Sequence, residues 1–225
     1  MRMRKKKHGA ERLSRCAHLL IEKPESPITD TERDFSRVAP LHLEIGCGKG
    51  AFACGMAEMH PDVCFYAMER VKDVMVLAAE KASDRRESRP ADNLRFILGD
   101  AGNLTEWFSE GSVDTIYLNF SDPWPKKGYA KRRLTHRRFL QLYARLLRED
   151  GTVRFKTDNR PLFDFTLLEL SELGITPDFV TFDLHNSAYN EGNVMTEYEE
   201  SFSSQGVPIN CLQFRFPKNF LKEDL

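Results

Sequence analysis

The sequence contains no long hydrophobic run, no paired-cysteine motif and no internal repeat. No apolar stretch approaches the roughly 18 residues of a membrane-spanning helix, and the charged N-terminus lacks the apolar segment of a secretory signal. The cysteines are odd in number and form no C-x-x-C pair, so we expect neither a disulfide framework nor a zinc site. The histidines show no metal-ligand spacing either. We therefore expect a cytoplasmic protein with reduced thiols and without a metal.

Charge is distributed unevenly, although the formal net charge is only −1. Basic residues cluster in residues 1–15 and again in residues 123–138, and the second block contains no acidic residue. Acidic residues gather elsewhere, notably in residues 191–201. Two separated basic blocks on a nearly neutral chain favour a local nucleic-acid surface, although two solvated segments without a ligand could have this composition.

The chain of 225 residues has the length of one domain with an extension, and 41% hydrophobic residues can form a sizeable core. Residues 1–35 are polar and predict a basic N-terminal arm, flexible or with a short helix, ahead of a domain over residues 36–225. Apolar patterning then predicts strands over residues 41–45, 63–69, 94–100, 113–120, 152–158, 177–185 and 208–216. Helices are expected over residues 51–59, 71–86, 135–150 and 161–174, with a short one near residues 103–110. This alternation predicts an α/β fold with a doubly wound, mostly parallel sheet, which binds ligands at the carboxyl ends of its strands.

The first predicted strand runs into EIGCGKG, where Gly46 and Gly48 allow a tight turn and close approach of a ligand to the backbone. The same residues fit a dinucleotide-binding turn. Glu44, however, would repel a phosphate and attract a cationic ligand such as a sulfonium or an ammonium, unless it is only a solvated acid. Glu69 and Asp100 end the next two predicted strands. They could accept hydrogen bonds from a ribose and an adenine, or they could cap helices.

This pattern of acidic strand ends around E-x-G-x-G resembles the class I methyltransferases. The resemblance implies S-adenosylmethionine as cofactor and a Rossmann-like, seven-stranded sheet with an antiparallel C-terminal strand.

The segment NFSDPWPKKGYAKRR, residues 119–133, is more specific. With LEIGCGKG, FKTDN, TEYEESF and the basic N-terminus, it resembles the bacterial tRNA (guanine-N7-)-methyltransferases over most of the chain. The family methylates the guanine at position 46 in the tRNA variable loop. By motif, the resemblance implies that Asp122 is catalytic. It implies cofactor contacts at Glu44, Gly46, Gly48, Glu69, Asp100, Asn103 and Asp122. It implies substrate contacts at Lys126, Asp158, Thr196, Glu197, Tyr198 and Glu199. It implies RNA contacts at Gly128, Tyr129, Ala130, Lys131, Arg132 and Arg133.

The chemistry agrees with these residue types. Guanine N7 carries a lone pair and no proton, so methyl transfer to it needs alignment and exclusion of water rather than a strong base. Carboxylates can accept from the N1–H and N2–H₂ donors of guanine, and we favour positioning over proton abstraction for Asp122. Trp124 could stack on an exposed base or could pack the loop onto the domain.

Other functions remain open at this stage. The loop faintly resembles the [ND]-P-P-[YFW] motif of exocyclic amino methyltransferases, but the second proline is missing. A non-catalytic RNA-binding module is a further alternative, and a dehydrogenase is least favoured because of Glu44. No obligate protein partner is inferred, and the protein could be a monomer or a homodimer.

Overall fold

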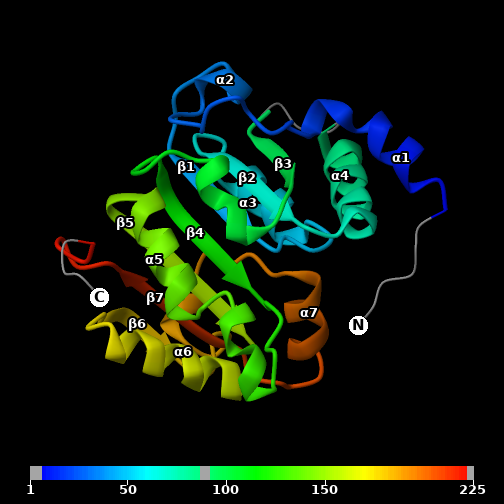
Figure 1. Cartoon of the computed structure of the whole chain (residues 1–225). Coiled ribbons are helices and arrows are strands. Elements are labelled where there is room, and N and C mark those ends of the chain that lie inside the picture. The colour runs from blue at the N-terminus through cyan, green and yellow to red at the C-terminus, as the bar shows by residue number, and fades with distance from the viewer. Residues whose placement is uncertain (1–6, 87–91, 222–225) are drawn as a thin grey trace.

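The computed structural model describes residues 7–86 and 92–221. Seven strands form one sheet in the order β3-β2-β1-β4-β5-β7-β6 (Figure 1). The strands are β1 (Leu41–Ile45), β2 (Cys64–Glu69), β3 (Leu94–Leu98), β4 (Val113–Asn119), β5 (Leu147–Thr157), β6 (Pro177–Thr181) and β7 (Asn210–Arg215). Neighbours from β3 to β5 pair in parallel, and β7 pairs antiparallel with both β5 and β6. The predicted fold class, including the antiparallel C-terminal strand, is confirmed.

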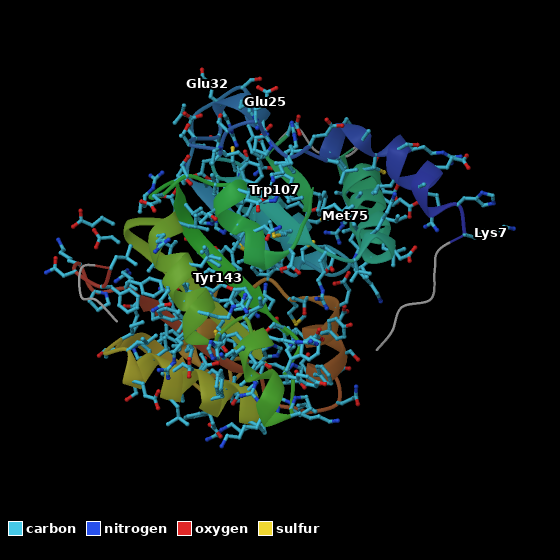
Figure 2. All side chains as sticks on the ribbon, in the orientation of Figure 1. Lys7, Glu25, Glu32, Met75, Trp107 and Tyr143 are labelled. Atoms are coloured by element: carbon cyan, nitrogen blue, oxygen red, sulfur yellow. The ribbon has the colours of Figure 1, made fainter. Side chains whose placement is uncertain are left out.

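Helices cover both faces of the sheet (Figure 1). They are α1 (Gly9–Arg15), α2 (Glu32–Phe35), α3 (Ala51–Met59), α4 (Lys72–Arg86), α5 (Arg137–Leu146), α6 (Arg160–Glu172) and α7 (Glu197–Ser203), with 3₁₀ turns η1 (Ala17–Leu19), η2 (Ala101–Glu106), η3 (Lys127–Arg132) and η4 (Ala188–Asn190). In β2, Phe65 packs with α3 and α4, whereas Tyr66 packs with the cluster on the opposite face. Met75 of α4 and Tyr143 of α5 are fully buried in these two layers (Figure 2). Alternate residues of a strand point to opposite faces, so a sheet covered on both sides needs apolar residues at nearly every position.

One helix boundary was predicted wrongly. The helix expected to run to Asp150 ends at Leu146, and Leu147 already pairs with Val113 as the first residue of β5. The pairing then shifts, with Asp150 in a left-handed conformation (φ 67°), before regular pairing resumes at Thr152. The leucine fits either the helical stripe or a buried strand, and only pairing across the sheet decides between them.

Several short elements in the loops were not predicted, and two of them lie in segments that carry expected contacts. The turn η3 (Lys127–Arg132) lies within the basic run, and α7 (Glu197–Ser203) forms in the acidic segment that precedes β7. The short helix expected near residues 103–110 is the 3₁₀ turn η2 (Ala101–Glu106).

Most of the segment expected as an N-terminal arm packs on the domain. Leu13 of α1 is buried with α4, and Arg12 donates two hydrogen bonds to Glu80 of that helix. Further along, Leu20 bridges to Phe96 and Ile28 bridges to Phe108. Residues 9–35 therefore contribute to the core of the domain, and the prediction of a flexible arm is wrong for them; residues 1–6, the other part of the predicted arm, lie outside the described residues.

Candidate functional site

The acidic residues expected at the strand ends meet at one edge of the sheet. β1 to β5 are parallel, so their carboxyl ends lie at the same edge. Following the strand order, the carboxylates come in the sequence Asp100, Glu69, Glu44, Asp122 and Asp158. The topology thus brings together side chains that are up to 114 positions apart in the chain, since residue 158 minus residue 44 is 114.

Glu44 is a buried acid with unused capacity for hydrogen bonds. Its side chain is 3% exposed, and its Oε1 accepts a hydrogen bond of 2.9 Å from Nδ2 of Asn119, the last residue of β4. Within the described residues, Glu44 Oε2 and Asn119 Oδ1 are buried acceptors without a partner. Burial raises the pKa of Glu44 to about 7, against the opposing effects of Asn119 and Lys156. Two orphaned acceptors, one of them a carboxylate, suit the N–H groups of an ammonium.

The glycine turn is built around Glu69 rather than around a phosphate site. Gly46 and Gly48 have φ of 81° and 57°, conformations that favour glycine, and a Cβ at either position would meet nothing within 4 Å. Glu69 Oε2 accepts a hydrogen bond of 3.2 Å from the Gly48 amide, and Oε1 accepts one of 2.8 Å from the Val71 amide. A phosphate approaching this turn would therefore meet a carboxylate already bound to its backbone donor. The geometry argues against the dinucleotide-binding alternative.

Asp100 and Asn103 lie at the outer end of this row. Asp100 caps η2, because its Oδ1 accepts a hydrogen bond of 2.8 Å from the Gly102 amide. Its other oxygen lies 4.0 Å from Arg70, and more than half of the side chain is exposed. Asn103 is exposed as well. Capping thus accounts for one oxygen of Asp100, and the remaining polar atoms face solvent.

Asp122 lies in a turn of unusual backbone geometry. Phe120 and Trp124, on either side of it, adopt positive φ values of 50° and 41°, which cost free energy in residues other than glycine. The Asp122 side chain is exposed, and no hydrogen bond or ion pair to it occurs within the described residues. The turn is therefore strained, and it leaves the Asp122 carboxylate at the end of β4 exposed and without a partner among the described residues.

Arg133 holds the turn in place from behind. Its Nε donates to the Pro123 carbonyl at 3.0 Å and its guanidinium donates to the Trp124 carbonyl at 3.1 Å, while it packs over Phe165. Trp124 is partly buried, with its ring edge-on to Tyr129. In this structure the Trp124 ring packs within the loop, against Tyr129 and Arg132, and its stacking on an exposed base stays a prediction.

Some cations of the basic run contact aromatic rings or carboxylates of the protein, and others make no such contact within the described residues. Arg132 lies over the rings of Trp124 and Tyr129, at 4.9 and 4.7 Å from their centroids. Arg137, the next arginine after Arg133, is engaged by Glu169 and Glu172 of α6. Lys126, Lys127 and Lys131 are exposed, and no ion pair among the described residues involves them. Arg132 is exposed as well, so these three lysines and Arg132 are cations that an external polyanion beside Asp122 can contact.

The expected substrate contacts differ widely in exposure. Tyr198 is 57% exposed, and Asp158 is partly buried, with a pKa raised by that burial. Thr196 caps α7 by accepting from the Glu199 amide at 3.0 Å, and Glu197 pairs with Lys81 of α4.

Glu199, the remaining residue of this group, is fully buried and accepts hydrogen bonds from Lys156, His185 and Asn193. In this geometry Glu199 faces the protein interior, and it presents no free oxygen to a substrate.

Four residues that the sequence reasoning missed support the site: Asn119, Lys156, His185 and Asn193. The signal for two of them was present, because a polar residue ends the apolar run of β4 and a lysine interrupts the buried strand of FKTDN. A polar side chain inside a buried strand requires a partner, but the sequence does not say which one.

Within residues 7–86 and 92–221, His, Cys, Asp and Glu side chains form no group of three that could hold a metal. In the same part of the chain, no helix is both long and apolar enough to cross a membrane.

Solved structures share the fold. A 16S rRNA methyltransferase, KamB, superposes with a TM-score of 0.65 at 14% identity, over 86% of this chain and 96% of that chain. An antibiotic-related methyltransferase superposes with a TM-score of 0.59 at 16% identity, over 86% and 98% of the two chains. At these identities the likeness extends to the fold alone.

Sequence relatives are much closer. A family model described as a putative methyltransferase matches residues 38–212. The tRNA (guanine-N(7)-)-methyltransferase of Listeria monocytogenes serotype 4b (strain F2365) is 45% identical over 219 residues, which are 97% of this chain and 100% of the relative. The enzyme of the same name from Bacillus cytotoxicus is 42% identical over 96% of this chain and 97% of the relative. Together with the row of carboxylates and the free lysines beside Asp122, these matches show that the chain belongs to the tRNA (guanine-N(7)-)-methyltransferase family.

Proposed function

We propose that the protein transfers a methyl group from S-adenosylmethionine to N7 of the guanine at position 46 in the variable loop of tRNA, in the cytoplasm. The observation that carries this proposal is the junction at the end of β4. There, an unpaired carboxylate at Asp122 adjoins the buried acceptors of Glu44 and Asn119 on one side and three free lysines on the other. An enzyme that joins a cationic donor to a polyanionic acceptor needs both kinds of charge at one point.

The residues of the glycine-turn side fit the proposed cofactor. S-adenosylmethionine supplies an activated methyl group on a sulfonium and carries no phosphate. Glu44 Oε2 and Asn119 Oδ1 would accept from its ammonium, and the second lone pairs of the Glu69 oxygens would accept from its ribose hydroxyls. Asp100 and Asn103, exposed at the outer end of the row, would contact the adenine. Gly46 and Gly48 would leave space for the bound molecule, since no atom lies where their Cβ atoms would be.

The residues on the other side of β4 fit the guanine. Asp122 and the partly buried Asp158 would accept hydrogen bonds from its N1–H and N2–H₂ groups and would stabilise the positive charge that develops on the ring. No general base is required, because N7 loses no proton when it is methylated. The contribution of these carboxylates is orientation and electrostatic stabilisation.

The lysines on the loop are expected to govern tRNA affinity and its dependence on salt. Replacing Lys126, Lys127 and Lys131 together by alanine should weaken tRNA binding and reduce the slope of log K against log[salt] by about 2, at roughly 0.7–0.9 per lost phosphate contact. The measurement is tRNA binding at a series of salt concentrations.

Arg138 provides the matched control for this experiment. It is an exposed arginine of α5 that packs over Phe139, outside the predicted RNA contacts. Arg138→Ala should change the slope of log K against log[salt] by less than the roughly 0.7–0.9 expected for the loss of one phosphate contact. A salt slope unchanged in the triple variant would show that the three lysines do not bind phosphate.

The experiment that tests the proposed function is methyl transfer from radiolabelled S-adenosylmethionine to tRNA, followed by digestion and identification of the modified nucleoside. We expect N7-methylguanosine at position 46, and a transcript with adenine at that position should remain unlabelled. Only N6-methyladenosine in the digest would instead support an exocyclic amino methyltransferase. Binding of tRNA without binding of S-adenosylmethionine would support the non-catalytic module.

A further inference from the structure

β5 carries a charged side chain in the interior of the domain. Lys156 is 1% exposed. Its Nζ donates to Asn193 Oδ1 at 3.0 Å, to the Val194 carbonyl at 2.9 Å and to Glu199 Oε2 at 2.5 Å. The three acceptors match the three N–H groups of an ammonium, so the buried cation is fully satisfied.

The partner carboxylate is equally well satisfied. Glu199 is 0% exposed, and its Oε1 accepts from His185 Nε2 at 2.9 Å and from Asn193 Nδ2 at 2.7 Å. Burial raises its pKa, but Lys156 and the two other donors outweigh burial and hold the pKa below its usual range. The network therefore ties β5, the loop before α7 and α7 itself together inside the protein.

The same lysine is connected to the Asp122 loop. Its main-chain carbonyl accepts a hydrogen bond of 2.9 Å from the Phe120 amide, at the point where the loop leaves β4. The Phe120 ring in turn stacks with Tyr198 and Phe202 of α7, at centroid distances of 6.5 and 6.3 Å. α7 and the Asp122 loop thus touch each other, and both are attached to Lys156.

The segment before α7 has little room to move. A Cβ on Gly55 of α3 would lie 2.6 Å from Val194 Cγ1, so Val194 packs directly against the helix backbone. Lys156 Nζ also lies 5.1 Å from the centroid of the Phe52 ring on α3. Stability alone does not require a buried ion pair, because well-packed apolar residues often stabilise as much, whereas a pair with several directional bonds can specify one arrangement.

We propose that Lys156 is a positioning residue for methyl transfer. Through Glu199 and Asn193 its side chain fixes residues 193–199, and α7, held in this way, keeps Tyr198 stacked on Phe120 at the start of the Asp122 loop. The inference rests on the proposed function, and it gives Glu199 a role in holding α7 rather than in binding guanine.

The test compares Lys156→Met, Glu199→Gln and the double variant, each assayed well below its own melting temperature. Hydrogen exchange of the α7 amides should become faster in both single variants, while the amides of β1 and β2 keep their protection. We expect kcat for tRNA to fall about 100-fold, the loss typical of a displacement of about 1 Å, with the Kd for S-adenosylmethionine changed less than threefold. The double variant should be no slower than the slower single variant, because one substitution already releases α7.

Tyr66→Phe is the matched control. It removes a partly buried hydrogen bond of 2.8 Å from the buried Tyr66 to Asp34, away from the catalytic edge of the sheet. It should lower the melting temperature and leave kcat within twofold. If Lys156→Met does not fold, Asn193→Ala keeps the ion pair and should still lower kcat about tenfold with faster exchange in α7.

Two results would overturn the proposal. One is a normal kcat in Lys156→Met, and the other is losses that multiply in the double variant, which would mean that Glu199 acts on the substrate independently. If the wild-type protein transfers no methyl group to tRNA but α7 exchanges faster in the variants, the proposed function fails while the anchoring of α7 by Lys156 stands.

Discussion

Asp122→Ala is expected to lower kcat for tRNA methylation by about 10²–10³-fold and to leave the melting temperature within about 1 °C of the wild type. The first effect follows because removal of one preorganised electrostatic group from a reaction centre costs about 3–4 kcal/mol. The second follows because the side chain is exposed and makes no hydrogen bond within the described residues, so its loss leaves no partner unsatisfied. Single-turnover kinetics with saturating tRNA and thermal unfolding are the two measurements.

Glu110→Ala is the control for this prediction, because Glu110 is an exposed acid before β4, at the opposite end of that strand from Asp122. It should leave kcat unchanged. Asp122→Glu retains the charge but moves it by one methylene, and it should recover only part of the rate if position matters. Turnover of Asp122→Ala within a few-fold of wild type would exclude a catalytic role for this carboxylate.

Glu44→Gln is expected to raise the Kd for S-adenosylmethionine by roughly 30- to 100-fold, the 2–3 kcal/mol of a hydrogen bond to a charged group. The variant should at the same time be more stable than the wild type without cofactor above pH 7. Gln can still accept from Asn119 Nδ2, and its amide can donate to the unpartnered Asn119 Oδ1. Isothermal titration calorimetry and denaturant unfolding at pH 8 measure the two effects. A variant with lower stability and unchanged affinity would show that Glu44 is a structural residue.

The pH dependence of cofactor binding follows from the same carboxyl. Its pKa is raised from an ordinary value of 4.5 to about 7, so below pH 7 the free protein holds Glu44 protonated. Binding an ammonium requires the carboxylate and releases this proton, while an α-ammonium group, with a reference pKa of roughly 7.7–8.0, stays charged below pH 7. Affinity should therefore fall about tenfold per pH unit between pH 7 and pH 5, and Glu44→Gln should flatten this dependence.

Stability responds to pH in the opposite sense. The pKa of Glu44 is higher in the folded protein than in the unfolded chain, so the folded protein binds its proton more tightly. The stabilising contribution of this proton is fully present below pH 4.5. This contribution is lost as pH rises through 7, where ionised Glu44 destabilises the cofactor-free fold by about 3 kcal/mol. A carboxylate that costs stability but suits an ammonium is typical of a functional site rather than of a structural one.

The sequence predicted that the acidic strand ends of the candidate site meet at one edge of the sheet, but it did not predict which side chains are free there. The alternation of strands and helices identified the ends of β1 to β5, because strand ends in a parallel sheet share one edge whatever the details of packing. From the sequence, Glu44 and Glu199 were both acidic residues of a motif that was expected to contact a bound molecule. The structure gives Glu44 an unused oxygen and surrounds Glu199 with three donors.

In the basic loop, too, the sequence did not predict which charged side chains contact the protein and which are exposed. Lys131 and Arg133 are two positions apart in one charged run, and composition alone treats them alike. In the structure, Lys131 is exposed, whereas Arg133 donates to the carbonyls of Pro123 and Trp124 and supports the turn that carries Asp122. Arginine suits this second task because its planar group can donate to two acceptors at once.

The sequence by itself determined the fold class, the glycine turn and the positions of the acids at the strand ends, because these depend on local periodicity and on residues close together in the chain. The tertiary structure decided which residues form hydrogen bonds and ion pairs with one another. Glu44 meets Asn119 from 75 positions away, and Lys156 meets Glu199 from 43 positions away. Hydrogen bonds and ion pairs between such distant residues depend on how the helices and strands pack in three dimensions. That packing assigned Asp122 to solvent, Glu199 to the interior and residues 9–35 to the domain rather than to a free arm.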